Sequence, residues 1–240
     1  LQGSLPKSFR KIISDLSGLP LLLKFMSICE LADLELEAVL TDIRSSILIN
    51  IAKLSGVSEV IRFQSALALQ CFTNEYIYNR TEFEEMVLTK LENKVKRNFV
   101  DGQQPSSQTV LCLASYKPLH EYEWCDSLRV TNDIKAVAKR QLLEPREEQC
   151  LKSEIFVLNK VTDRVSKKVK EQYEQSPYPR WVNLGLRLNP TSVAKIIKEL
   201  ELKINQHNIQ KVDAPHILIA GCGTGQQSIE TASRFKGSKV

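Results

Sequence analysis

No two cysteines of this 240-residue sequence form a C-x-x-C pair, although the chain contains six of them. The usual zinc-ligand spacings are therefore absent, and we expect no metal site. Thiols scattered this widely do not fit the disulfide framework of a secreted protein. We predict reduced, mainly structural cysteines in a cytoplasmic protein, at these positions: Cys29, Cys71, Cys112, Cys125, Cys150 and Cys222.

Long apolar runs are also missing. A membrane-spanning helix needs roughly 18 apolar residues, whereas the longest candidates, LPLLLKF and SSILINIAKL, carry polar or charged residues at close intervals. No signal peptide is visible. The chain begins at Leu1 rather than Met, which indicates a piece of a longer polypeptide. We expect no membrane partner.

Strong charge of one sign is lacking, because the net charge is only +5. No arginine-rich arm or aromatic platform accompanies the two basic clusters, so we interpret both as solvated helix faces and consider nucleic acid an unlikely partner. These clusters are Lys90, Lys94, Lys96, Arg97 and Arg164, Lys167, Lys168, Lys170. With three histidines and no Ser/His/Asp set or paired carboxylates, the sequence indicates no catalytic side chain.

The first two thirds of the chain have helical patterning. Apolar residues recur every three or four positions from Asp33 to Leu54, which predicts an amphipathic helix with Asp33 as its N-cap. A second helix is expected over 58–73. A third begins at Thr81, which with Glu84 has the spacing of a capping box.

Further along, breaks alternate with helices. The polar stretch 101–108 predicts a surface loop. The helical pattern of 132–143 is expected to stop before Pro145. Helices are also expected over 162–175 and 190–204.

The last part of the chain changes character. The apolar run HILIA, residues 216–220, predicts a short strand buried in a parallel sheet. Three glycines follow at alternate positions, Gly221, Gly223 and Gly225, and a helical pattern comes next. Glycines permit a sharp turn and the close approach of a ligand to the backbone, and the helix N-terminus offers free N–H groups.

The residues around this turn narrow the choice of ligand. A phosphate-binding P-loop is excluded because no G-K-[S/T] follows. The dinucleotide fingerprint G-x-G-x-x-G is disfavoured because its third glycine position holds Gln226. A turn with a purely structural role remains an alternative.

The strings VSKKVKEQYEQSPYPRWV and ILIAGCGTGQQSIETASRFKGSKV closely resemble a bacterial family of class I S-adenosylmethionine-dependent methyltransferases that carry tetratricopeptide (TPR) repeats ahead of the methyltransferase domain. The stretch FQSALALQCFTNEYIYNRTEFE resembles the helical region which that family places between the two. The resemblance covers the chain from about residue 30 onward. The glycine spacing is generic to methyltransferases, whereas Q-Y-x-x-x-P-Y-P-R-W is more specific.

The resemblance implies a pocket for S-adenosyl-L-methionine lined by Ala220, Gly221, Cys222, Gly223, Thr224, Gly225 and Gln226. We expect Cys222 to be there for its small size. One departure concerns Ile219, because many class I enzymes have Asp or Glu two residues before the first glycine.

The PYPRW segment has two interpretations. Tyr178, Arg180 and Trp181 either fold over the cofactor, with Arg180 bonding its carboxylate, or join the helical region to the sheet. His216, at the start of the expected strand, is interpreted as structural.

The expected fold is therefore α/β. A mostly helical region, residues 1–155, serves as a linker or interaction module, and residues 156–240 hold the truncated start of a Rossmann-like domain: first strand, glycine loop and first helix. The acidic residue that binds ribose, roughly 20 residues past the glycines, would stand beyond Val240, so we expect this piece alone to be inactive.

The methyl acceptor, a protein or a small molecule, is not identified by the sequence. The alternative function is a helical protein-interaction module attached to a non-catalytic or degenerate nucleotide-binding fold.

Overall fold

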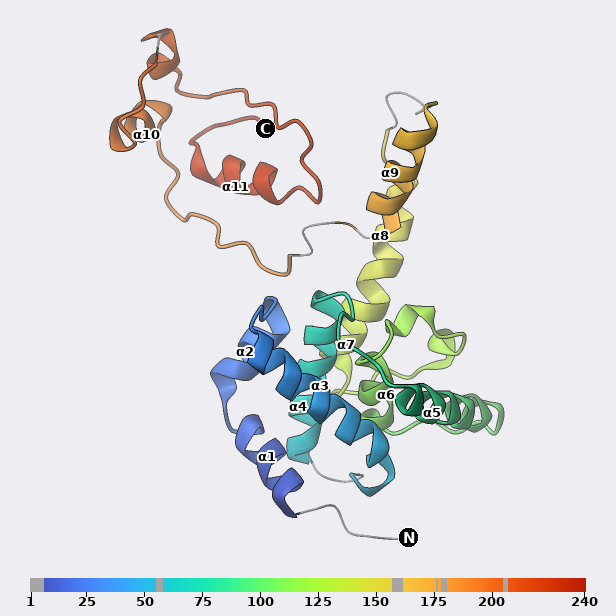
Figure 1. The fold of residues 1–240 in the computed structure, drawn as a ribbon. Helices are drawn as coiled ribbons and strands as arrows, with labels where there is room; N and C mark the ends of the chain where they lie inside the picture. Colours follow the sequence, from blue (N-terminus) through green and yellow to red (C-terminus); the bar gives the residue numbers. More distant parts are fainter. Residues whose placement is uncertain (1–6, 55–57, 157–161, 176, 178–180, 205–206) are drawn as a thin grey trace. The chain divides into compact units, whose positions relative to one another are not determined.

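A computed structural model describes residues 7–54, 58–156, 162–175, 177, 181–204 and 207–240. The chain divides into two compact units, Leu1–Val157 and Leu158–Val240. We call them the helical unit and the glycine-loop unit. Figure 1 shows helices in both and draws no strand arrow in the described parts.

The helical unit, in its described ranges, holds eight α-helices and several shorter turns. The α-helices are α1 (Lys7–Ser17), α2 (Pro20–Ile28), α3 (Leu34–Ile49), α4 (Ser58–Thr73), α5 (Glu82–Val100), α6 (Ser107–Ala114), α7 (Lys135–Ala138) and α8 (Glu144–Lys152). The shorter elements are the 3-10 turns η1 (Ile51–Lys53), η2 (Leu119–Glu121) and η3 (Cys125–Ser127) and the π-helical segment η4 (Lys139–Leu143).

Side-chain caps set the starts of two predicted helices. The Asp33 carboxylate accepts the backbone N–H of Leu36 at 2.8 Å and so begins α3. Thr81 and Glu84 form a complete capping box at the start of α5. Both predicted caps are confirmed, as is the helix over 58–73. The predicted loop over 101–108 ends slightly early, because Ser106 caps α6.

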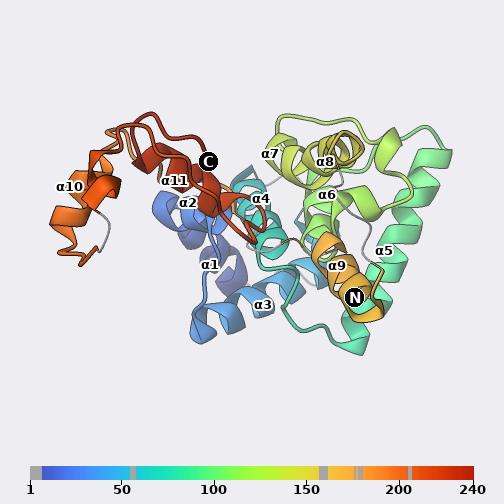
Figure 2. The same ribbon diagram turned by 90° about the horizontal axis from the view of Figure 1, so that it is seen from above.

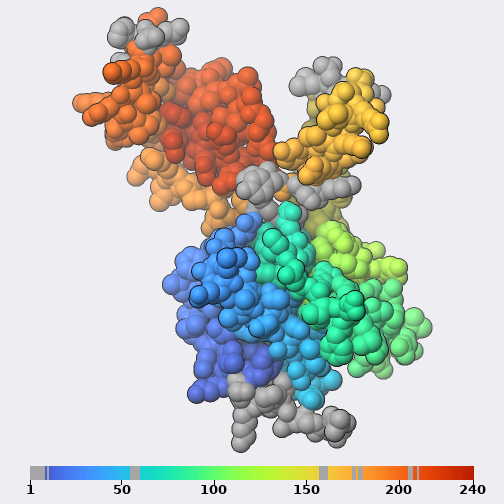
Figure 3. Space-filling model, viewed as in Figure 1, coloured from blue at the N-terminus to red at the C-terminus, as the bar shows by residue number. Residues whose placement is uncertain are grey.

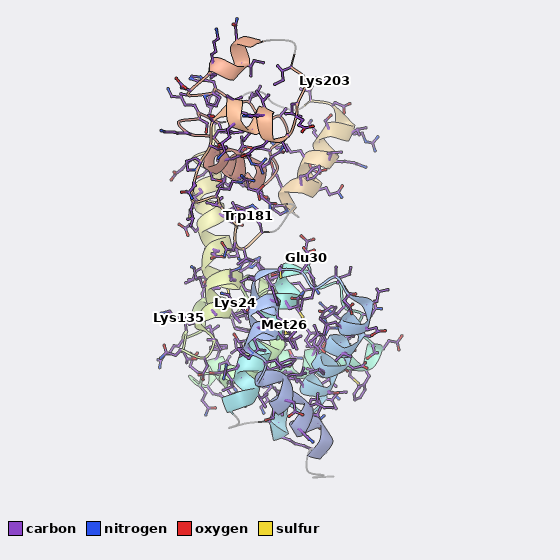
Figure 4. All side chains as sticks on the ribbon, turned by 90° about the vertical axis from the view of Figure 1, so that its left-hand side faces the viewer. Lys24, Met26, Glu30, Lys135, Trp181 and Lys203 are labelled. Atoms are coloured by element: carbon purple, nitrogen blue, oxygen red, sulfur yellow. The ribbon has the colours of Figure 1, made fainter. Side chains whose placement is uncertain are left out.

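Helix α4 is the centre of the hydrophobic core. It packs against α1, α2 and α6, and Figure 2 shows it between α2 and α6. Phe63 and Cys71 of α4 are fully buried, as is Met26 of α2, which Figure 4 labels. Burying each such apolar side chain contributes roughly 1.5–3 kcal/mol. On the face shown in Figure 3, side chains of this unit close over the core.

The helical pattern that begins near residue 132 does not stop before Pro145, so that prediction is wrong. Segments α7, η4 and α8 follow one another without a break from Lys135 to Lys152, and Pro145 lies in the first turn of α8. Proline lacks the N–H that a helix would donate to the Gln141 carbonyl. The His120 ring nitrogen Nδ1 lies 2.9 Å from that carbonyl oxygen, so it must carry the proton and donate. The π-helical turn and His120 thus accommodate the proline.

The side chain of Gln141 joins three elements at the centre of this unit. It is fully buried. Its amide nitrogen donates to the carbonyls of Ala68 in α4 and Ala114 in α6, at 2.9 and 3.0 Å. Its amide oxygen accepts the N–H of Leu119 at 3.3 Å. Since buried polar groups are costly when unpaired, this glutamine fixes the mutual positions of α4, α6 and η4.

A buried arginine anchors the loop that follows α4. Arg44 of α3 is fully buried, and its Nη2 donates to the carbonyls of Tyr78 and Asn79 at 3.3 and 2.6 Å. Its guanidinium carbon lies 4.2 Å from the centre of the Tyr116 ring, in a cation–π contact. The Tyr116 hydroxyl donates to the Glu84 carboxylate at 2.7 Å, so the ring stands between the two buried charges.

The glycine-loop unit has almost no buried core, in contrast to the helical unit. Among its described residues, Ile197 is the only buried side chain. It contains α9 (Arg164–Gln175), α10 (Val193–Glu199), η5 (His207–Lys211) and α11 (Gln226–Arg234). Helix α9 matches the prediction within two residues. Helix α10 is shorter than the predicted 190–204, since Glu201 adopts a left-handed backbone, with φ +51°.

The predicted strand over 216–220 is not formed. In its place the described residues show two isolated parallel bridges, Thr191 with Phe235 and His216 with Lys239. Leu218 is 92% exposed, so the run is not buried as expected. A strand needs a neighbour along its length, and here the pairing extends over a single bridge. The mostly helical part of the expected fold is observed, whereas the Rossmann-like start is not confirmed.

The first prediction concerns Gln141. Replacing it with leucine keeps the approximate volume but leaves the Leu119 N–H without its acceptor and removes both bonds to α4 and α6. We expect Gln141→Leu to lower the free energy of unfolding by about 2–3 kcal/mol in urea titrations. Gln104 is the matched control, an exposed glutamine that also bonds two backbone groups. Gln104→Leu should cost below about 1 kcal/mol, and equal losses would contradict the role of Gln141.

The second prediction concerns acid stability. Burial raises the pKa of Glu84, but hydrogen bonds from Tyr116 and Thr81 and the charge of Arg44 outweigh burial, so the pKa lies below its ordinary value of 4.5. Because the folded pKa is the lower one, the stabilisation is complete above about pH 4.5 and is lost as the pH falls through the folded pKa.

Tyr116→Phe removes one of those hydrogen bonds, so urea midpoints measured from pH 6 to pH 3 should fall less steeply with acid in this variant. Tyr122→Phe is the control, because its buried hydroxyl donates to the Leu113 carbonyl and not to a carboxylate. A Tyr116→Phe slope equal to that of the unmodified chain would contradict the assignment.

Candidate cofactor-binding loop

The three glycines of the loop all adopt left-handed backbone conformations. Their φ angles are +68° at Gly221, +55° at Gly223 and +82° at Gly225. Residues with a Cβ pay roughly 1–2 kcal/mol for this conformation. The alternate spacing of the glycines in the sequence is therefore matched by a backbone that favours glycine at each of the three positions.

Space around the loop is open. A Cβ built at Gly221 or Gly225 would meet no atom within 4 Å. Glycine is thus favoured at both positions by the backbone angles and not by a neighbouring side chain. The backbone of the loop is accessible, since Gly221 and Gly223 are exposed.

The loop leads directly into the N-terminus of α11. Gly225 is the N-cap residue, and no side chain caps the helix. Its carbonyl accepts the N–H of Ile229 at 3.0 Å, and its own N–H donates to the Cys222 carbonyl at 2.9 Å. Among the described residues, no side-chain cap therefore bonds the first-turn N–H groups of α11, which lie at the positive end of the helix dipole.

Trp181 contacts this loop from a distant part of the sequence. Its indole Nε1 donates to both the hydroxyl and the carbonyl oxygen of Thr224, at 3.1 and 3.3 Å. Figure 4 labels the Trp181 side chain. The two residues are 43 positions apart. The PYPRW segment and the glycine loop, which are separate motifs in the sequence, are thus joined through Trp181.

A backbone bridge encloses the loop and α11. Ile217 donates to the Lys239 carbonyl at 2.8 Å, and the Lys239 N–H donates to the Pro215 carbonyl at 2.9 Å. The two segments run parallel, so the chain leaves at His216, passes through the loop and helix, and returns beside its starting point. This is the connectivity of a strand–helix–strand crossover, held here by one bridge.

The other residues predicted for the cofactor site differ in how exposed they are. Ala220 and Cys222 are exposed, and Gln226 is half-buried at the start of α11. The Cys222 thiol has only a weak contact, 3.9 Å to the Gly223 carbonyl. Tyr178 and Arg180 lie outside the described residues. His216 is exposed and participates in the backbone bridge.

The loop is electrically neutral apart from the helix end. From Ile217 to Ile229 the sequence has no ionisable side chain except Cys222. In the part of the chain that the structure describes, no group of three His, Cys, Asp or Glu side chains is arranged to hold a metal ion. The site can therefore bind a ligand through backbone N–H groups and the helix dipole. Within the loop, the Cys222 thiol is the one ionisable side chain that could transfer a proton.

No protein-family model matches this chain, and neither a curated protein nor a solved structure matches it.

A third prediction tests the link between Trp181 and the loop. Trp181→Phe keeps an aromatic ring but removes the donor to Thr224. A hydrogen bond contributes about 0.5–1.5 kcal/mol, so amide hydrogen exchange at Gly223–Gln226 should become about 2- to 10-fold faster. Trp124→Phe is the control, because the buried Trp124 Nε1 has no hydrogen-bond partner among the described residues. Unchanged exchange in Trp181→Phe would mean that the bond does not order the loop.

Proposed function

We propose that this chain carries the cofactor-binding loop of an S-adenosyl-L-methionine-dependent methyltransferase of the TPR-linked type. One observation carries the proposal. Three glycines in left-handed conformations lead into the open N-terminus of α11, with Trp181 bonded to the same loop. The two motifs on which the family resemblance rests thus meet within one unit.

The residues present fit this cofactor in two respects. The exposed backbone of Gly221 and Gly223 admits close approach, and the uncapped start of α11 offers N–H groups to the carboxylate or the ribose hydroxyls. Trp181 holds Thr224 in place. Ala220, Cys222 and Gln226 complete the proposed lining, and the family resemblance adds Tyr178 and Arg180.

The chemistry of methyl transfer suits a loop with so few ionisable groups. The bound cofactor supplies a methyl group already activated on a sulfonium. The protein's part is then to hold the two reactants in line and to exclude water, and such positioning is a large share of catalysis. We therefore assign no catalytic acid or base, and we propose a protein or a small molecule as the methyl acceptor.

We also propose a cytoplasmic location. All six cysteines are free, two of them, Cys71 and Cys112, deep in the core. Free thiols are typical of reducing compartments. No helix in the described ranges is both long and apolar enough to cross a membrane.

The second candidate function is a helical interaction module with a degenerate nucleotide-binding fold beside it. Its support is the distribution of buried side chains. The core cluster belongs entirely to the helical unit, whereas the glycine-loop unit, in its described part, buries only Ile197. On this alternative the loop binds no cofactor.

The fourth prediction separates the two candidates. Isothermal titration should detect binding of S-adenosyl-L-methionine to the chain. Gly221→Ala and Gly223→Ala should each weaken it about 5- to 30-fold, the factor that corresponds to roughly 1–2 kcal/mol of backbone strain.

Gly185→Ala is the matched control, since Gly185 has open space around it and no left-handed backbone. It should bind like the unmodified chain. Absence of binding would favour the interaction module, and tighter binding of NAD would restore the dinucleotide alternative.

A further inference from the structure

The helical unit has a pocket that plays no part in the proposed cofactor site. Its volume is about 320 Å³, within the range of small-ligand pockets. One wall is the exposed side of α3 and the other is the loop after α4, represented by Ile77 and Tyr78. We call it the α3 pocket.

Two carboxylates line the α3 pocket, those of Glu37 and Asp42. Neither forms an ion pair with another described residue. Arg44, on the same helix, is fully buried and directs its Nη2 to backbone carbonyls. The pocket therefore presents two negative charges without a neutralising side chain.

A buried hydroxyl also lacks a partner at this pocket. Tyr78 lines it and is only 4% exposed, yet its hydroxyl has no hydrogen bond within the described part of the chain. The Asn74 side chain lies near enough to lower the pKa of Tyr78. Burial, and next the nearby Cys71 and Glu37 side chains, raises the pKa of Tyr78, so the phenol stays neutral. An unpaired buried hydroxyl is costly unless a ligand bonds it.

The loop wall is bonded to the rest of the helical unit. Glu75 and Tyr76 both have left-handed backbones, with φ of +56° and +59°, a conformation that non-glycine residues adopt only where the surrounding structure holds it. The Tyr76 hydroxyl donates to the Ala114 carbonyl at 3.2 Å, and Arg44 binds the Tyr78 and Asn79 carbonyls. These bonds join the loop wall to α3 and α6.

Apolar side chains complete the pocket. Leu34 and Ile77 line it and are 85% and 67% exposed. Thr41 also lines it, with its hydroxyl donating to the Glu37 carbonyl at 2.7 Å, so its lone pairs are available as acceptors. The lining, which also includes Ala38 and Asn79, therefore combines acceptor oxygens with apolar contact surface.

We propose that the α3 pocket binds an arginine side chain of a partner protein. The guanidinium presents five N–H donors, which match the Glu37 and Asp42 carboxylates and the oxygens of Thr41 and Tyr78. The aliphatic part of the arginine packs on Leu34 and Ile77, as long charged side chains do on apolar surfaces. The helical unit thereby gains a defined docking site, independent of whether the glycine loop binds a cofactor.

The test uses N-acetyl-arginine amide as the probe and two-dimensional NMR of the full chain as the readout. Backbone signals of residues 34–42 and 77–79 should shift. Glu37→Gln and Asp42→Asn should each weaken binding about 10-fold, as expected for the loss of a charge-assisted hydrogen bond. Glu35→Gln is the matched control, a first-turn carboxylate of the same helix that does not line the pocket.

Two further ligands test whether the pocket recognises the guanidinium group itself. N-acetyl-citrulline amide, the uncharged isostere, should not bind; equal binding would overturn the proposal. Cadaverine tests for a free amine as the natural ligand, and tighter binding than the arginine probe would also overturn it. Thermal melting checks that each variant is folded, and Asp42→Asn, on the solvent-facing side of α3 at the pocket, decides the outcome if Glu37→Gln is unstable. A Glu37→Gln variant that binds as well as Glu35→Gln would contradict the site.

Discussion

The burial of the Arg44 guanidinium is the constraint on which the helical unit depends. A charge fully removed from water must be paired or bonded. Two loop carbonyls accept from Arg44 Nη2, and the Tyr116 ring, with the Glu84 carboxylate beyond it, faces the guanidinium, while Nε and Nη1 have no hydrogen-bond partner among the described residues. Helices α3 and α5 and the loop after α4 are therefore fixed together by one side chain. The same loop forms a wall of the α3 pocket, so the hydrogen bonds of the buried Arg44 also position this wall.

Helices whose ends are set by local chemistry are predictable from the sequence. The Asp33 cap and the Thr81–Glu84 box lie three residues from their backbone partners, and their geometry is determined without the rest of the fold. The left-handed glycines agree with the alternate spacing for the same reason. The candidate loop is thus recognisable from its residues alone.

Features that depend on distant partners are not predictable in this way. Pro145 ends a helix by local rules, yet here it sits inside one because His120 bonds the Gln141 carbonyl. The apolar run at 216–220 meets the pattern of a buried strand, but a strand needs neighbours and this run has one bridge. The Trp181–Thr224 bond and the α3 pocket likewise join residues far apart in the sequence, which no local pattern marks.

The measurement that tests the proposed function most directly is photochemical cross-linking of labelled S-adenosyl-L-methionine to the chain, followed by tryptic mapping. Trypsin releases the glycine loop and α11 as one peptide, Val212–Arg234, because no Lys or Arg lies between its ends. Label concentrated in this peptide, and displaced by excess unlabelled cofactor, is the predicted result. Label spread over the helical unit, or no displaceable label, would contradict the assignment of the loop as a cofactor site.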